Sequence, residues 1–314
     1  VVTIATFIRS LEAFEIEQII GIPAGIYVYG TRIYDLVRWD PPLYSQAMAL
    51  STIFLFVLFG AVLLYQRSSR HHEFATLRPG GASFRPALIG KWRYFASGWL
   101  ILWIAVSIYL PLAMVLIGSF MKFFGMFGLQ QPFTIQHWAA VLGDPAFTSA
   151  LQNSLILGFS VAGVGVVVYS VLGYLILRGR FVGRATLSLL VWIPWAIPGI
   201  LLGLSLLWIF LSVRFFNFLY GTMFVLIFSV VLKDMPIGTQ MFKAAFAQVT
   251  EELEQASRVS GAGPFTTFRR ITVPLIAPMI VSIFVLVFMS SIRDISTPIL
   301  LATPATTPLS VLML

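Results

Sequence analysis

Long uncharged stretches alternate with short charged connections along this chain of 314 residues. Each apolar stretch reaches or nearly reaches the roughly 20 residues that a helix needs to cross a bilayer. Polar and apolar residues do not alternate within them, as barrel strands would require, and a helix satisfies its own backbone polar groups in lipid. The pattern predicts an all-α fold, a polytopic bundle of transmembrane helices. The expected spans lie within residues 41–66, 94–121, 145–177, 185–213, 215–232 and 271–292.

The composition agrees with a membrane protein. Hydrophobic residues make up 59% of the chain and charged residues only 10%, whereas soluble domains carry about 25% charged residues. The net charge of +8 raises the question of a nucleic-acid partner. The basic residues, however, gather in short connections beside apolar runs, which is typical of cytoplasmic loops. We therefore expect residues 67–93, 178–184 and 243–270 on the cytoplasmic side, and membrane lipid rather than nucleic acid as the surroundings.

Two stretches far apart in the sequence resemble each other. Residues 1–24 align with residues 282–305 without a gap, and both stretches leave an apolar run, carry charge near its end and then reach a proline. The identical pairs are Phe7 with Phe288, Ser10 with Ser291, Pro23 with Pro304 and Ala24 with Ala305. We expect two tandem copies of one unit in a fragment cut at both ends, since repeated halves are common in transporters. Residues 1–66 would end the first, truncated copy, 67–93 would form a cytoplasmic linker, and 94–314 would form a second copy lacking its last transmembrane helix.

A charged segment, EELEQASRVSGAGPFTTFRRITVP, interrupts the apolar pattern at residues 251–274. Acidic residues at its start favour a helix because of the helix dipole. Gly261 can end that helix and Pro264 can begin another, so the prediction is two short helices joined at a glycine. A plain amphipathic helix at the bilayer surface is the alternative that composition alone leaves open. The first helix would carry a small, weakly apolar face suited to close approach by another surface: Leu253, Ala256, Ser257 and Ser260.

The spacing in this segment resembles the EAA loop of permease subunits of binding-protein-dependent ABC importers. The family pattern is E-A-A, three residues, G, nine residues and I-x-L-P. Residues 255–257, Gly261 and residues 271–274 meet that spacing without a gap. Gln255, Ser257 and Val273 depart from the family's residue types. The first departure removes a charge that the family's helix usually offers its partner, although Glu254 lies next to it.

The resemblance covers the whole chain, because residues 7–36, 133–158 and 290–314 look like parts of fused permeases of the ferric-iron importer type. It implies a MetI-like permease fold in the bacterial inner membrane. It also implies a solute-binding protein that delivers substrate from outside and two ATPase subunits that bind the EAA loops from inside. Ferric iron is the leading substrate class, and permeases for thiamine, polyamines or phosphonate share much of this layout. The implied ATPase-coupling loop consists of Glu254, Gln255, Ala256, Ser257, Gly261, Ile271 and Pro274.

No catalytic, cofactor or metal site is expected in this chain. It contains no G-x-x-x-x-G-K-[ST] run, so a partner subunit would bind and hydrolyse ATP. Three histidines and no cysteine make a poor basis for a catalytic triad or a metal centre. His71 and His72 have no third ligand at a usable spacing and are interpreted as solvated linker residues.

Three residues inside the spans are candidates for a translocation path. Pro194 and Pro198 interrupt one span, and a kink of this kind lines a path in some proteins and serves packing in others. Asn153 begins another span and either contacts solute or bonds to neighbouring helices. Arg293 and Asp294 end the last span, where we expect an exposed pair at the membrane interface rather than a substrate gate.

Two other functional classes remain open at this point. A secondary transporter also has repeats and kinked spans, but it would not need the EAA spacing and more often buries an ionisable residue, whereas the expected spans contain none. A non-transporting membrane scaffold or enzyme would bind no ATPase through its cytoplasmic segment. A second EAA segment upstream of Val1 would favour the importer.

Overall fold

The structure, a computed structural model, describes residues 14–70, 90, 92–123 and 132–314. The regular elements in this part of the chain are helices, apart from one isolated antiparallel bridge between Met121 and Phe133. The predicted all-α fold is confirmed. The chain divides into two compact units, one of residues 1–72 with 149–314 and the other of residues 73–148.

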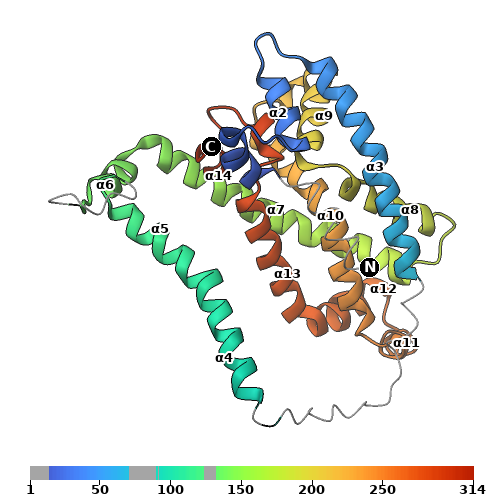
Figure 1. The fold of residues 1–314 in the computed structure, drawn as a ribbon. Helices are drawn as coiled ribbons and strands as arrows, with labels where there is room; N and C mark the ends of the chain where they lie inside the picture. The colour runs from blue at the N-terminus through green and yellow to red at the C-terminus, as the bar shows by residue number, and fades with distance from the viewer. Residues whose placement is uncertain (1–13, 71–89, 91, 124–131) are drawn as a thin grey trace. The chain divides into compact units, whose positions relative to one another are not determined.

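The larger unit contains most of the membrane helices and the charged segment that interrupts them (Figure 1). Its helices and helical turns before the linker are η1 (Glu17–Gly21), η2 (Ile22–Ala24), α2 (Tyr29–Arg38) and α3 (Tyr44–Arg70). Those after it are α7 (Pro145–Arg178), α8 (Arg184–Trp192), η4 (Ile193–Ala196), α9 (Gly199–Ser212), η5 (Asn217–Leu219), α10 (Met223–Ala247), α11 (Glu251–Val259), α12 (Pro264–Thr267), η6 (Phe268–Thr272), α13 (Val273–Arg293), η7 (Pro298–Leu300) and α14 (Leu309–Leu312).

The smaller unit consists mainly of one long apolar helix. α4 (Trp92–Ile104), η3 (Ala105–Tyr109) and α5 (Leu110–Phe120) follow one another without a break, and α6 (Gln136–Gly143) comes after a connection. η3 is a π-helical turn, and it precedes Pro111, which has no N–H to donate to the backbone ladder. No residue of α4 or α5 is buried in the protein, as expected of a helix that faces lipid or another chain.

Four helices in the described part of the chain are long and apolar enough to cross a membrane, and a bent pair makes a fifth if it is counted as one span. The four are Trp92–Phe120, Pro145–Arg178, Met223–Ala247 and Phe265–Arg293, and the bent pair is Arg184–Ala196 with Gly199–Ser212. α3 contributes a shorter apolar stretch, Tyr44–Gly60. The predicted polytopic arrangement is confirmed.

The fifth span is broken at the two prolines that the sequence singles out. Its two parts meet at an angle of 104°. Ile197 has the extended conformation that a following proline favours, and Pro198 is the N-cap residue of α9. Pro194 and Pro198 also bring no N–H to a helical ladder. The predicted kink is confirmed, and it is a complete break between two helices.

α10 is longer than the sequence predicts. The uncharged run ends before Lys233, but the helix continues through Lys233, Asp234 and Pro236 to Ala247. Pro236 leaves a gap in the backbone hydrogen bonds. One turn earlier, the Tyr169 hydroxyl of α7 donates a 2.7 Å hydrogen bond to the carbonyl of Val231, which supports the helix at this point. The expectation that the spans contain no ionisable residue is therefore wrong for α10.

Two hydrophobic cores hold the larger unit together, and α9 contributes to both. The first lies between α7, α9, α10 and α13, with Tyr169, Phe242 and Phe246 fully buried. The second lies between α2, α3, η4 and α9, around Ile33 and Ile200. Because α9 packs into both cores, the break that precedes it has a defined position.

Candidate functional site

α11 and the glycine after it form as predicted. Gly261 has φ +87°, a left-handed conformation that costs a residue with a side chain about 1–2 kcal/mol. Its N–H donates to the carbonyl of Arg258 at 2.9 Å, and the N–H of Ala262 donates to the carbonyl of Ser257 at 3.1 Å. These two bonds make the Schellman pattern of a helix C-terminus. α11 therefore ends sharply after 9 residues.

The second half of the segment differs from the prediction. α12 is not a separate short helix, because it continues through η6 into α13, and residues 265–293 form one helix of 29 residues. η6 is a π-helical turn in which the N–H of Val273 donates to the carbonyl of Phe268. Pro274 follows directly and supplies no N–H, which accounts for the widened turn. Ile271 is half-buried in η6, and Pro274 is exposed.

Glu254 points into the protein from α11. Its side chain is buried. One carboxylate oxygen accepts a hydrogen bond from the Tyr174 hydroxyl of α7, and the other accepts one from the Thr272 hydroxyl of η6, each at 3.4 Å. The Tyr174 ring is held edge-on by Phe246 and Phe268. Since a buried carboxylate needs such partners, Glu254 connects α11 to two membrane helices.

Ser257 makes a second inward connection. Its hydroxyl lies 2.9 Å from the hydroxyl of Thr267 in α12, and the two share a hydrogen bond. Thr267 is buried, and its hydroxyl also donates to the carbonyl of Gly263 at 3.2 Å. The inward face of α11 is therefore fixed to the beginning of the 265–293 helix through both Glu254 and Ser257.

The opposite face of α11 is exposed. Because Ser257 turns inward, the small-residue face that the sequence predicts is divided between the two sides. Val259 is 90% exposed and Leu253 is 47% exposed, and an apolar stripe rimmed by polar residues is typical of a protein interaction surface. We call this surface the outer face of α11, and it consists of Leu253, Gln255, Ala256, Val259 and Ser260.

A basic cleft of about 580 Å³ lies beside α11. It is lined by the end of α7, the turn that leads to α8, and α11: Leu177, Arg178, Arg180, Arg184, Glu254, Gln255 and Arg258. Arg178 donates to the carbonyl of Val249 at 2.5 Å, so it also holds the backbone ahead of α11. With four arginines against one glutamate, the cleft is suited to an acidic group on a partner.

The remaining predicted site residues lie elsewhere in the larger unit. Pro194 and Pro198 are buried at the break in the fifth span. Asn153 is half-buried in α7, where its amide donates to the carbonyls of Ala305 at 3.0 Å and Thr307 at 3.2 Å. In this conformation Asn153 fastens the segment after α13 to α7. A role for these three residues in a solute path stays a prediction.

An ion pair inside the larger unit was missed by the sequence reasoning. Nζ of Lys233 lies 2.7 Å from Oδ1 of Asp294, and Asp294 is only 6% exposed. The expectation of an exposed Arg293 and Asp294 pair is therefore wrong for Asp294, whereas Arg293 is exposed. The reason is that α10 continues past the end of its uncharged run and carries Lys233 to Asp294. The apolar residues at helical spacing after Pro236 were the signal that the helix continues: Met241, Phe242, Ala245 and Phe246.

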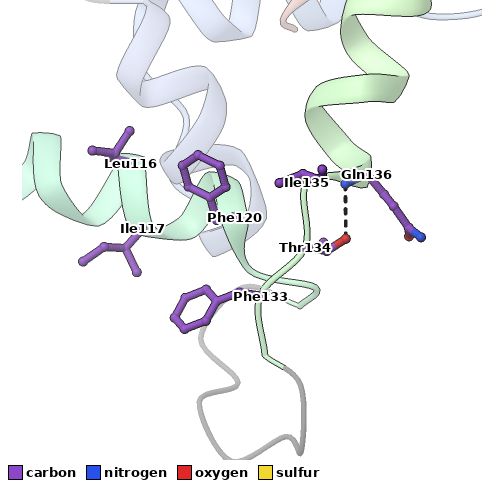
Figure 2. A pocket seen from close by; sticks show the side chains of 7 residues that line it. All are labelled: Leu116, Ile117, Phe120, Phe133, Thr134, Ile135 and Gln136. Atoms are coloured by element: carbon purple, nitrogen blue, oxygen red, sulfur yellow. Dashed lines mark hydrogen bonds between the residues drawn. The ribbon is translucent and has the colours of Figure 1, made fainter.

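A second hollow, of about 890 Å³, lies in the smaller unit between the end of α5 and the residues before α6 (Figure 2). Its lining is largely apolar, and Phe133 and Ile135 are exposed at its surface. The hydroxyl of Thr134 already accepts a 3.2 Å hydrogen bond from the N–H of Gln136 (Figure 2). A site for a polar solute needs several converging polar groups, so this hollow does not resemble one.

One known protein family matches the part of the chain that contains α11 and the spans around it. Residues 165–313 match the family described as "Binding-protein-dependent transport system inner membrane component". That region includes the second part of α7, the broken span, α10, α11 and α13. The segment singled out by its charge and spacing is thus part of a region that this family shares.

Curated relatives align with nearly the whole chain. The "Putative ferric transport system permease protein FbpB 1" of Haemophilus influenzae is 26% identical over 311 residues, which are 96% of this chain and 47% of that protein. The "Ferric transport system permease protein FbpB" of Actinobacillus pleuropneumoniae is 24% identical over 311 residues, 96% of this chain and 43% of that protein. The chain spans about half the length of the curated relatives it matches.

A solved structure shares the fold. It is the crystal structure of a bacterial alginate ABC transporter in complex with an alginate pentasaccharide-bound periplasmic protein. The TM-score is 0.54 at 21% sequence identity, over 69% of this chain and 81% of that chain. At this identity the likeness concerns the fold alone. The predicted permease fold is confirmed.

Proposed function

Because residues 165–313 of this chain belong to the binding-protein-dependent transport system inner membrane components, we propose that the protein moves a solute inward across the membrane as part of an ABC importer. The chain is a multi-pass permease component of the inner membrane. In this proposal separate ATPase subunits bind and hydrolyse ATP, and a solute-binding protein delivers the solute from outside.

The observation that carries the proposal is the difference between the two faces of α11. Its inward face is bonded to α7 and to the 265–293 helix through Glu254 and Ser257, while its outer face is exposed. A subunit that moves on ATP binding can move membrane helices only through an element that is gripped on one side and fixed on the other. The inward bonds of α11 and its exposed outer face support this role for it.

The outer face of α11 and the basic cleft define the chemistry of the ATPase surface that docks here. The exposed side chains of Leu253 and Val259 would fit an apolar groove on the ATPase. The arginines of the basic cleft would pair with an acidic group at the rim of that groove. Gln255 lines the cleft but carries no charge, so the electrostatic part of the contact comes from the neighbouring arginines.

Co-purification with the ATPase tests this proposal. In Val259→Asp, a carboxylate enters the apolar contact, and we expect the permease to insert normally but to lose its co-expressed ABC ATPase during purification in detergent. Val213→Asp, the same change at an exposed position after α9, is the matched control and should retain the ATPase. Equal retention by both variants would argue against docking on α11.

For the solute, we propose ferric iron. The support is the likeness, over 96% of this chain, to relatives whose names state ferric transport. Uptake of radiolabelled Fe³⁺ into proteoliposomes containing the permease, its ATPase and its binding protein tests this choice. Thiamine, a polyamine and a phosphonate are the competing solutes in the same assay, and uptake without ATP would instead support a secondary transporter.

A further inference from the structure

The Lys233–Asp294 ion pair lies in the membrane-spanning part of the larger unit. Lys233 comes from the middle of α10, and Asp294 follows the last residue of α13. The side chain of Asp294 is 5% exposed and that of Lys233 is 26% exposed. The hydroxyl of Ser296 joins the pair, because it lies 3.0 Å from Nζ of Lys233 and 3.1 Å from Oδ1 of Asp294. Ionisable groups at such positions are expensive and usually serve a function.

The break in the fifth span lies against this pair. A side-chain carbon at Gly199, the first residue of α9, would lie 2.9 Å from Nζ of Lys233 and 2.8 Å from Oγ1 of Thr297, and it would collide with the hydroxyl of Ser296. Because Gly199 has no side chain, the start of α9 can lie close to Lys233, Ser296 and Thr297. The first N–H groups of a helix have no partner within it. The start of α9, a lysine and several hydroxyl groups thus meet at one place.

Several buried oxygens at this place have no hydrogen-bond partner among the described residues. They are Oδ2 of Asp294, Oδ2 of Asp234 and Oγ1 of Thr297. Thr297 is fully buried, and its closeness to Gly199 shows that its hydroxyl points at the break. The other oxygen of Asp234 accepts a 3.4 Å hydrogen bond from Ser290. Because buried polar groups without partners are costly, each one asks for an explanation.

The charges and donor atoms indicate the kind of ligand. Two carboxyl groups, those of Asp234 and Asp294, lie near one ammonium, that of Lys233, so acidic side chains outnumber basic ones among these three. The other donors are hydroxyl oxygens, and an all-oxygen set suits a hard metal cation. An anion would meet two carboxylates, and a neutral sugar would not need them. No three His, Cys, Asp or Glu side chains form a metal cage within the described residues.

We propose that Asp294 contacts the solute as it passes the break between η4 and α9, and that this solute is a multivalent metal cation. Lys233 holds the carboxylate while the path is empty and gives way when the stronger cation arrives. The proposal rests on the proposed function as an importer and adds to it the place and the charge of the contact. Asp234 and the hydroxyl of Thr297 supply further oxygens beside Asp294.

The neutral double variant Lys233→Gln/Asp294→Asn tests the proposal in the assembled importer. The double change removes both partners of the ion pair together, so neither is left as an unpaired charge and the complex should still form. We expect uptake of radiolabelled Fe³⁺ to fall by about tenfold or more at equal amounts of assembled complex, with the ATPase activity that the binding protein stimulates retained. The matched control is Arg32→Gln/Asp35→Asn, which neutralises an exposed ion pair of the same unit and should leave uptake unchanged.

The other outcomes separate this proposal from the proposed importer function. Uptake near that of the unaltered protein would make the Lys233–Asp294 pair a structural link only, and failure of the double variant to assemble would do the same. Either result overturns the proposal and leaves the importer function intact. ATP-driven uptake of a neutral or anionic solute by the unaltered protein would also overturn it. Absence of any ATP-driven uptake by the unaltered protein would instead contradict the proposed function.

Discussion

The carboxylate of Glu254 accepts a 3.4 Å hydrogen bond from the hydroxyl of Thr272, which lies 18 residues further along the chain. The bond closes a loop around the left-handed turn at Gly261 and ties α11 to the helix of residues 265–293. Gln255, the next residue on α11, is exposed beside the basic cleft. One peptide bond therefore separates an inward anchor from an exposed side chain, and a displacement of α11 has a direct route to a membrane helix.

Glu254→Ala should uncouple α11 from the spans. The Thr272 and Tyr174 hydroxyls lose their common acceptor, and an unsatisfied buried group costs about 1–3 kcal/mol. We expect the ATPase to remain bound while solute uptake per ATP hydrolysed falls. Glu252→Ala, at an exposed position on the same helix, is the control. Equal transport ratios for the two variants would contradict the anchoring role.

Gly261→Val should impair transport without preventing insertion or assembly. A side chain at Gly261 meets no atom within 4 Å, so the cost of the change is the left-handed backbone conformation, about 1–2 kcal/mol. We expect the backbone at this turn to change conformation and to alter the orientation of α11. Gly263→Val is the control, because Gly263 also has open space around it and lacks the positive φ. The measurement is ATP-driven uptake at matched membrane levels, and normal uptake by Gly261→Val would count against α11 as the element that passes movement to the membrane helices.

The local features of this molecule could be predicted from the sequence. The end of α11 at Gly261 depends on one glycine and two backbone hydrogen bonds, and the broken span depends on Pro194 and Pro198. Apolar runs of sufficient length predict the spans because a bilayer sets that length. Each of these features follows from residues that are close together in the chain.

Features that depend on distant residues could not be predicted in this way. Glu254 and Gln255 are neighbours with similar polarity, and only the packing of α11 against Tyr174 and Thr272 decides which one turns inward. Lys233 marks the end of an uncharged run, yet its helix continues because Asp294 and Tyr169 provide partners from other elements. The predicted second short helix likewise proved to be the first turn of a membrane span.

Asn153→Ala should lower the thermal stability of the larger unit. The amide of Asn153 donates to two carbonyls after α13, those of Ala305 and Thr307, and each lost hydrogen bond is worth about 1 kcal/mol. We expect a lower unfolding temperature in detergent, with uptake reduced in parallel. The neighbouring exposed Gln152→Ala is the control. Reduced uptake at unchanged stability would instead support a direct contact between Asn153 and the solute.

Gly238→Ala should destabilise the contact between α7 and α10. The added carbon would fall on the ring of Tyr169, a fully buried side chain, and overpacking of a core costs about 1–3 kcal/mol. Gly163→Ala is the control, because it adds the same carbon to a helix of the same core with no atom within 4 Å. Fluorescence-monitored thermal unfolding should show a lower midpoint for Gly238→Ala alone, and equal midpoints would contradict the close packing.

Cross-linking from α11 tests the central claim most directly. The chain contains no cysteine, so Ala256→Cys on the outer face of α11 provides a single attachment point for a thiol-reactive photo-cross-linker, and Thr222→Cys at the exposed start of α10 provides the control. We predict that light joins the Ala256→Cys permease covalently to the ABC ATPase subunit and leaves the Thr222→Cys permease free of it. No adduct from Ala256→Cys, or equal adducts from both positions, would contradict the assignment of α11 as the ATPase-docking helix.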